Sequence, residues 1–199
     1  MKIELTKNTA NTLASLLVFA DNPRASVNRQ LTEINCKIEA GQLTAQATDR
    51  YALVQFTDTL EAPDCKFRLT HNLAKFIKAN TGKRYSGPVE VELGDGGEVT
   101  ISLDYGRQSL TEIPSQANYP ELGKLLEGWK ADTEAKIQAF RIDLLSKLAA
   151  VQLEGRKAEV WEFEQGQNPS ELSGRPGPLL ARHGKKLVAM VQPNLLRRD

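Results

Sequence analysis

The chain has 199 residues, 40% hydrophobic and 26% charged, a balance that is typical of a globular protein and argues against a disordered one. Its formal net charge of +1 excludes a strongly basic, histone-like protein but leaves room for a local basic patch. The two cysteines form no spaced framework, and no apolar run resembles a signal peptide or a membrane helix. We therefore expect a cytoplasmic protein that is not held together by disulfides.

The first elements are a strand, a helix and three further strands. Residues 1–7 alternate apolar and charged side chains, as a half-buried strand does. Residues 8–23 carry leucines at helical spacing, and Asn8 or Thr9 is the expected N-cap. Three strand-like runs follow, at 34–38, 43–47 and 51–56.

The same order of elements returns from residue 65. A short strand at 65–70 precedes a helix at 71–84, whose apolar residues share one face. A hairpin at 88–104 then turns at the glycine-rich residues 94–97. Residues 107–113 supply the third strand after the helix.

From about residue 135 the order of elements appears a third time. A strand at 135–142 leads to a helix at 144–153, with Leu145, Leu148 and Ala149 on one face. Three strand candidates follow, at 159–165, 177–184 and 185–193. The sequence thus predicts an α+β protein of three βαβββ units of about 65 residues each, although a less regular α+β fold could be divided in the same way.

Three open-sheet units would leave unpaired strand edges, which invite aggregation. Such edges disappear if each sheet continues into the next unit and the assembly closes through copies of the chain. The repeat therefore predicts an oligomer, with a ring as the expected form.

The charges separate by type of element. The helix at 71–84 contains four cations and no acid, whereas the hairpin at 88–104 contains five acids and no cation. The third unit repeats the contrast more weakly, with Lys147 and Arg156 in or just after its helix. A surface shared by the helices would be a positive track suited to phosphates, with no residue set that reads bases. An ordinary solvated charged face is the alternative.

Four stretches of the chain resemble bacterial DNA sliding clamps, the β subunit of the replicative polymerase. They are ATDRYAL (47–53), FRLTHNLAKFIKAN (67–80), SLTEIPSQANYPELGKLL (109–126) and KKLVAMVQPNLL (185–196). None is specific alone, but the four occur in the family's order over most of the chain. The resemblance implies a DNA-clamp fold, in which helices on one face line a hole for duplex DNA and antiparallel sheets form the outer wall.

The resemblance also implies two sets of functional residues. A hydrophobic groove for short peptides from polymerase, clamp loader and repair proteins would be lined by Thr48, Leu53, Pro120, Leu125, Met190 and Pro193. Plain core packing is the alternative for Leu53 and Leu125. The residues expected to face DNA are Arg24, Lys75, Lys78, Lys83, Arg84, Lys147 and Arg156.

The chain is shorter than the family's three domains of two units each. Residues 1–126 would form one complete domain, 127–132 a linker and 133–199 half of a domain. If a ring needs the family's roughly twelve units, four chains of three units supply them, while a trimer or a dimer remains open.

No catalytic or metal-binding pattern stands out. His71 lies at an expected helix start and His183 in an expected turn, and Cys36 alternates with apolar residues toward a core. The glycines at 94–97 join two strands and open no helix, so they predict no phosphate-binding loop.

We therefore expect a sliding clamp, a non-enzymatic processivity factor without cofactor or metal. Its expected partners are double-stranded DNA, polymerase and clamp-loader peptides, and further copies of the chain. The alternative is a clamp-fold interaction module or decoy that binds replication partners without encircling DNA.

Overall fold

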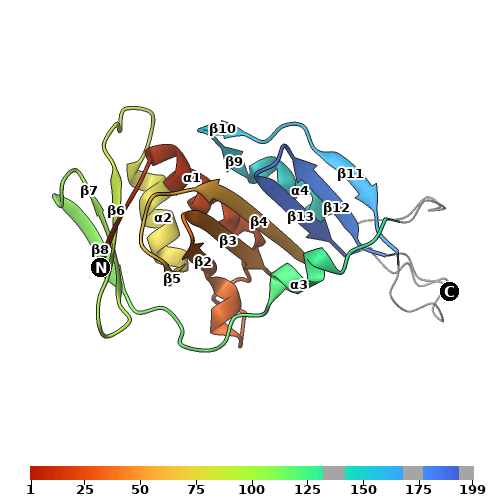
Figure 1. Cartoon of the computed structure of the whole chain (residues 1–199), viewed down its shortest axis with the longest axis horizontal. Coiled ribbons are helices and arrows are strands. Elements are labelled where there is room, and N and C mark those ends of the chain that lie inside the picture. Colours follow the sequence, from red (N-terminus) through yellow and green to blue (C-terminus); the bar gives the residue numbers. More distant parts are fainter. Residues whose placement is uncertain (132–141, 168–176, 193–199) are drawn as a thin grey trace.

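The computed structural model describes residues 1–131, 142–167 and 177–192, and every structural statement below concerns these residues (Figure 1). The first unit contains β1 (Lys2–Leu5), α1 (Lys7–Ser15), the short 3₁₀ helices η1 (Leu16–Phe19) and η2 (Arg29–Thr32), and the strands β2 (Ile34–Glu39), β3 (Gln42–Thr48) and β4 (Ala52–Thr59).

The start of α1 differs from the prediction. Thr6 has an extended backbone, and its side chain accepts a hydrogen bond of 3.1 Å from the backbone N–H of Thr9. Thr6 is therefore the N-cap, and the prediction of Asn8 or Thr9 was wrong. The helix also ends sooner than predicted, because the chain tightens into η1 from Leu16.

The second unit has the predicted order: β5 (Cys65–Leu69), α2 (His71–Asn80), β6 (Val89–Leu93), β7 (Val99–Leu103) and β8 (Gln108–Glu112). Thr70 caps α2 as Thr6 caps α1, since its side chain accepts from the N–H of Leu73 at 3.2 Å. The helix ends at Asn80, so Lys83 and Arg84 lie beyond it and not within it.

The third unit follows a short helix, α3 (Leu122–Glu127), which the sequence pattern did not predict. It contains α4 (Ile142–Ala150), β9 (Gln152–Leu153), β10 (Arg156–Lys157), β11 (Glu162–Gln165), β12 (Leu179–His183) and β13 (Leu187–Val191). The three strands predicted after the helix are present as β11, β12 and β13. The strand predicted before it lies almost wholly outside the described residues. The small β9–β10 hairpin, which turns at Glu154 and Gly155 with positive φ, was not predicted.

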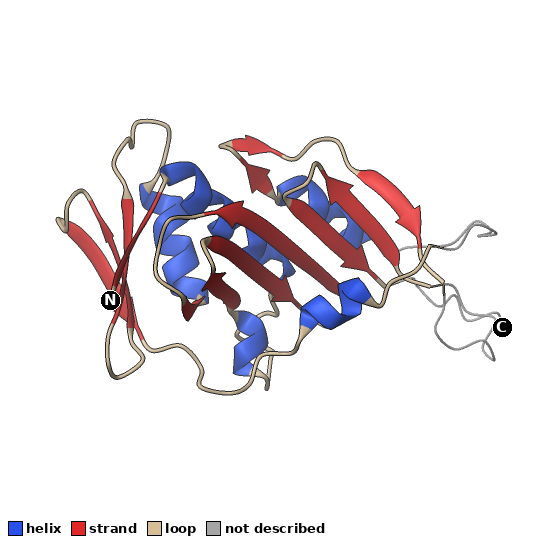
Figure 2. Ribbon diagram, viewed as in Figure 1, coloured by secondary structure: helices blue, strands red, loops and turns tan. Residues whose placement is uncertain are grey.

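The strands form two large antiparallel sheets (Figure 2). One has the order β1-β6-β7-β8, and the other has the order β11-β12-β13-β4-β3-β2-β5. The first two units exchange strands, because β1 pairs with β6 of the second unit and β5 pairs with β2 of the first. The sheet of the first unit continues into the third through the β4–β13 pair, as predicted for a repeat that covers its own edges.

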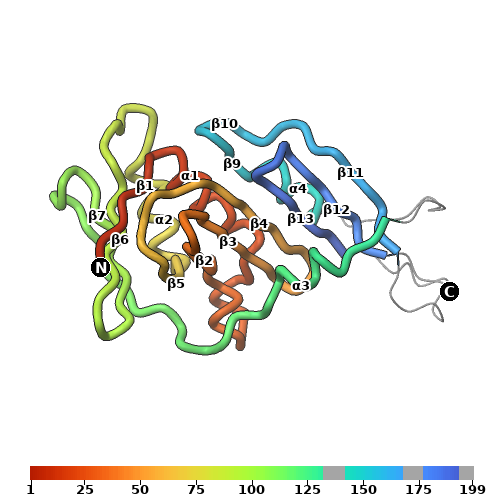
Figure 3. The backbone as a smooth tube through the Cα atoms, in the orientation of Figure 1, coloured from red at the N-terminus to blue at the C-terminus, as the bar shows by residue number. Residues whose placement is uncertain are grey.

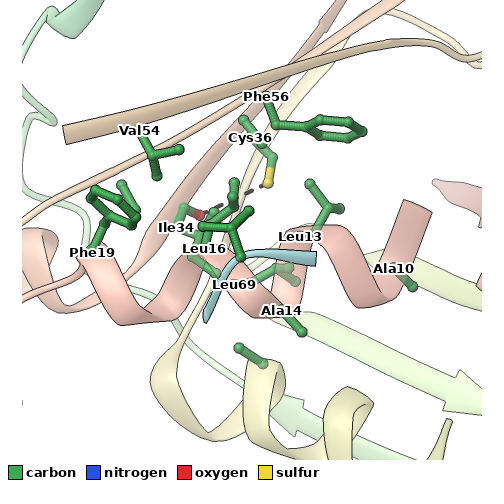
Figure 4. Packing of buried hydrophobic residues seen from close by; sticks show 14 of the residues in the cluster. Ala10, Leu13, Ala14, Leu16, Phe19, Ile34, Cys36, Val54, Phe56 and Leu69 are labelled. Carbon is green, nitrogen blue, oxygen red and sulfur yellow. Dashed lines mark hydrogen bonds between the residues drawn. The ribbon is translucent and has the colours of Figure 1, made fainter. Parts of the chain in front are cut away.

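The main core lies between the seven-stranded sheet and the helices. Leu13 of α1, Leu16 and Phe19 of η1, and Cys36 and Phe56 of the sheet are 0–1% exposed (Figure 4). Cys36 is thus a buried thiol, as its alternation with apolar residues predicted, and burial raises its pKa. In Figure 2, α1 and α4 lie on the same face of this sheet.

Candidate nucleic-acid and peptide interfaces

The exposed face of α2 carries two unpaired lysines. Leu73, Ala74 and Ile77 are fully buried, and the 3.6-residue period places Lys75 and Lys78 on the opposite side, where both are exposed. Neither lysine takes part in an ion pair within the described part of the chain. We call Lys75 and Lys78 the α2 basic face.

Lys83 and Arg84 are exposed in the turn that follows α2. Lys7, at the start of α1, holds this turn, because its ammonium group donates to the backbone carbonyl groups of Lys83 at 3.3 Å and Tyr85 at 2.7 Å. Asn11 of α1 and Thr81 at the end of α2 also exchange hydrogen bonds. The positive charge next to α2 therefore sits on a well-anchored backbone.

The other three cations predicted to face DNA have different surroundings. Arg24 is exposed in a turn after η1, and Arg156 is exposed on β10. Lys147 of α4 is instead largely buried, with its ammonium group paired to Asp49 and 5.8 Å above the centre of the Phe19 ring. An internal contact therefore already engages Lys147.

Asp49 organises the corner between β3 and β4. One carboxylate oxygen accepts the N–H groups of Tyr51 at 3.0 Å and Ala52 at 2.8 Å, and the other binds Lys147. Arg50 adopts a left-handed conformation with φ of 79° and forms a 3.1 Å ion pair with Asp21. The charged pair between the two strands thus closes a tight turn and ties the first unit to α4.

A second apolar cluster lies on the face of the seven-stranded sheet opposite the main core. We call it the outer apolar cluster; its buried members are Leu53, Leu122, Leu180 and Met190. Strand alternation explains it, because Ala52 and Val54 point into the main core while Leu53 between them points outward. Met190 is the register partner of both Leu53 and Leu180. The cluster therefore straddles the seam between the first and third units.

The predicted groove residues divide between this cluster and its surroundings. Leu53 and Met190 lie in it, and buried Thr48 lies at the same end of β4, where its hydroxyl donates to the carbonyl of Ala52 at 2.8 Å. Pro120 is exposed just before α3, and Leu125 is 56% exposed on α3. Pro193 lies outside the described residues.

Sequence reasoning missed two members of the outer apolar cluster. Leu122 is 3% exposed and covers the cluster from α3, and Leu180 comes from β12. The spacing of Leu122 and half-buried Leu126 was the available signal, since residues four apart share one side of a helix. That side of α3 contacts the sheet, and Leu125 is turned toward solvent.

Strong polar contacts hold the connector between β8 and α3 along the end of the sheet (Figure 3). Arg68 donates to the carbonyl groups of Ser115 at 2.7 Å and Ala117 at 2.6 Å, and its guanidinium lies 5.6 Å from the centre of the Tyr119 ring. Glu33 accepts the N–H of Ser115 at 2.8 Å. Burial raises the pKa of Glu33, while Ser115 and Arg68 oppose that rise. These contacts fix the path along which the chain reaches the outer apolar cluster.

None of the helices in the described ranges is long and apolar enough to cross a membrane. The described residues also contain no group of three or more His, Cys, Asp or Glu side chains placed to hold a metal ion.

No protein-family model and no curated protein sequence matches the chain. Solved structures do match it. The DNA polymerase III β subunit of Thermotoga maritima aligns with 98% of this chain and 66% of its own, with a TM-score of 0.71 and 12% identity. A DNA polymerase sliding clamp of Pseudomonas aeruginosa aligns with 98% of this chain and 67% of its own, with a TM-score of 0.69 and 12% identity. The Helicobacter pylori β clamp bound to a DNA ligase peptide aligns with 100% of this chain and 68% of its own, with a TM-score of 0.60 and 13% identity.

The chain therefore has the fold of the bacterial sliding clamps, as the four sequence stretches implied. It spans about two thirds of the length of the solved clamps that it matches. At this identity the likeness shows the fold alone.

Proposed function

We propose that this chain works as a sliding clamp, which encircles duplex DNA as a homo-oligomeric ring and tethers polymerase and other replication proteins in the cytoplasm. The main support is the match of 98% of the chain to clamp structures, together with the unpaired α2 basic face. The clamp fold fits a protein without catalytic activity.

In the proposed mechanism, lysine and arginine side chains touch phosphates and read no bases. Lys75, Lys78, Lys83 and Arg84 make the main contacts, with Arg24 and Arg156 at their flanks. Each contact is weak and screened by salt, so the protein moves along the duplex, and the closed ring prevents its loss. Lys147 is paired with Asp49, which offsets its charge, so it makes no direct phosphate contact in this mechanism.

Ring closure requires contacts between copies of the chain. The strand β4 pairs with β13, whereas β8, which occupies the matching place in the second unit, has an outer edge without a partner among the described residues. We propose that this edge joins copies. Four chains fit the count of units, with 1–126 as the complete domain, 127–132 as the linker and 133–199 as the half domain.

The partner groove lies at the outer apolar cluster in this proposal. Half-buried Leu126 and Val188 pack against the buried Leu53 and Met190, and exposed Leu125 precedes Leu126 on α3 as the proposed apolar rim. Thr48, Pro120 and Pro193 complete the proposed lining. A DNA ligase peptide, bound to the Helicobacter pylori clamp, is the kind of ligand expected.

Topological retention tests DNA encirclement. The protein is mixed with linear duplex, the ends are ligated, and the circles are isolated at high salt. We expect wild type to stay on circles and to leave after one restriction cut. Lys75→Ala/Lys78→Ala should weaken the initial binding about tenfold or more, because two phosphate contacts per chain are lost.

The matched control is Lys37→Ala/Lys66→Ala, which removes two cations that are paired in register on the outer face of the sheet. This double variant should load as wild type does. Equal retention of wild type on cut and closed DNA, or no retention on either, would favour the interaction module that does not encircle DNA.

Fluorescence anisotropy with a labelled DNA ligase peptide tests the groove. Leu125→Asp should weaken binding about tenfold or more, since it places a charge where a leucine would be covered. Val27→Asp is the control, because Val27 is 92% exposed and lies outside the outer apolar cluster. If both variants bind the peptide equally well, the groove lies elsewhere.

A further inference from the structure

The third unit has an apolar face that no described residue covers. Leu145 and Ala149 of α4 form, with Trp161, Phe163 and Leu179, the main part of an open hollow of about 360 Å³. We call these five residues, with the outer edge of β11, the third-unit face. Leu145 and Ala149 belong to the helix face that the sequence predicted to be buried. Leu148 of that face is 3% exposed, but Ala149 is exposed.

Phe163 shows most directly that a covering layer is missing. It lies in one register row with Ala181, Ala189 and Val54, which are all 0% exposed on the helix side of the sheet. Phe163 is on the same side yet is 53% exposed. The other three residues of the row are buried, and only Phe163 on β11, the last strand of this sheet in the described part of the chain, is exposed.

The helices differ in burial in the same way as the strands. Counted from the first residue of each helix, Leu145 has the place in α4 that Ala10 has in α1 and Ala74 has in α2. Ala10 and Ala74 are 0% exposed in a core to which both helices contribute. Leu145 is only half-buried, and Ile142 on the same helix is 79% exposed.

The first two units show what covers such a face in this fold. The outer edge of β2 is paired by β5 of the second unit, and the outer edge of β6 is paired by β1 of the first. Each unit thus gives a strand to the other and receives one, while α1 packs on α2. This reciprocal exchange is the relation that a two-fold axis produces. In the first two units, therefore, one βαβββ unit is covered by another βαβββ unit.

We propose that the third-unit face binds the third-unit face of a second copy of this chain, so that two half domains form one complete clamp-like domain. The sequence of β11 supports a second copy as the binding partner. Glu162, Phe163 and Glu164 repeat the acid–apolar–acid alternation of β6, whose outer edge is covered by a strand of the neighbouring unit. An identical surface on both partners closes with exact two-fold symmetry. The contact gives the self-association in the proposed function a surface, yet it needs no DNA.

The mass of the full chain in solution tests this contact. Ile142→Glu/Phe163→Glu places charges on two side chains that are exposed in the single chain, so folding should be kept. In sedimentation at micromolar concentration, wild type should be a dimer or a tetramer, and the variant should have half that mass. Val27→Glu, the control, should match wild type. A monomeric wild type, or a variant with the mass of wild type, would overturn the proposal.

Hydrogen exchange of β11 provides a second readout that does not rest on a variant. Alternate amides in Glu162–Gln165 bond to β12 within the chain and should be protected at any concentration, whereas the amides that point to the outer edge should be protected only at high protein concentration and should lose that protection on dilution. Protection of the outward-pointing amides in a monomer would overturn the proposal, since the chain then covers its own face. Lack of protection in an oligomer would also overturn it, because the copies then meet elsewhere. This second outcome leaves the DNA retention experiment untouched, so the proposal for the third-unit face can fail while the proposed function stands.

Discussion

The first two units and the third unit share one plan but differ in how well they are sealed. Leu13 and Ile77, on the core sides of α1 and α2, are 0% exposed, and so is the Cys36 side chain of β2. On the third unit, Leu145 of α4 is half-buried and Phe163 of β11 is 53% exposed. The sequence of α4 is more apolar than those of α1 and α2, so a polar helix does not explain the lower burial of Leu145; a neighbouring unit, which covers α1 and α2, does.

This contrast indicates that one βαβββ unit is only half of a stable layer structure. A helix resting on a three-stranded sheet buries one side of the helix and leaves its flank and the sheet edge bare. In the first pair of units, α1 and α2 cover each other and two exchanged strands cover two edges. The third unit gains one covered edge through the β4–β13 pair, but its opposite edge, that of β11, has no partner strand among the described residues.

The largest expected effect comes from the same substitution made in both regions. Leu13→Ala should lower the free energy of unfolding by about 2–5 kcal/mol, because it leaves a cavity in a sealed core. Leu145→Ala should lower it by about 1 kcal/mol or less in the single chain, because solvent already reaches that side chain. Chemical denaturation at low protein concentration measures both values.

Protein concentration then sharpens the comparison. If a second copy covers Leu145, the cost of Leu145→Ala should grow as concentration rises, whereas the cost of Leu13→Ala should stay constant. Equal costs for the two variants at low concentration would show that the third unit is sealed by its own chain. The contrast between the regions would then be wrong.

The order of elements was predictable because each unit carries strong local signals. Alternating residues mark the strands at 34–38 and 43–47, and the glycines at 94–97 mark the hairpin between β6 and β7. The buried thiol of Cys36 followed from the same alternation. These features depend on a few neighbouring residues, so a single sequence contains them.

Other features depend on contacts between distant segments and could not be predicted in this way. The outer apolar cluster combines Leu53, Leu122 and Met190 from three separate stretches. Lys147 looked like a free cation in the sequence, but its partner Asp49 is 98 residues away. Phe163 lies in the strand predicted at 159–165, and its exposure reflects a neighbour that is absent from the described residues and that no local pattern encodes.

Asp49 joins the two regions, and its substitution should have a smaller effect than Leu13→Ala. Asp49→Ala removes two hydrogen bonds to backbone N–H groups and the ion pair to Lys147, at a cost of about 1–3 kcal/mol. Asp49→Asn keeps an oxygen that can accept both N–H groups but loses the ion pair. Its cost should be about 1 kcal/mol, because the paired groups are largely but not completely buried.

Asp21→Asn provides the matched control for this seam. The same chemical change there breaks the pair with Arg50, whose side chain is 55% exposed, so a cost of about 0.5 kcal/mol or less is expected. A double-mutant cycle of Asp49→Asn with Lys147→Met isolates the pair itself, and a coupling energy near zero would contradict its role. A clear coupling energy would mean that the corner of the first unit fixes α4. α4 would then be held in place by its contact with the first unit. The exposed flank of the third unit would therefore have a defined orientation even before a second copy binds.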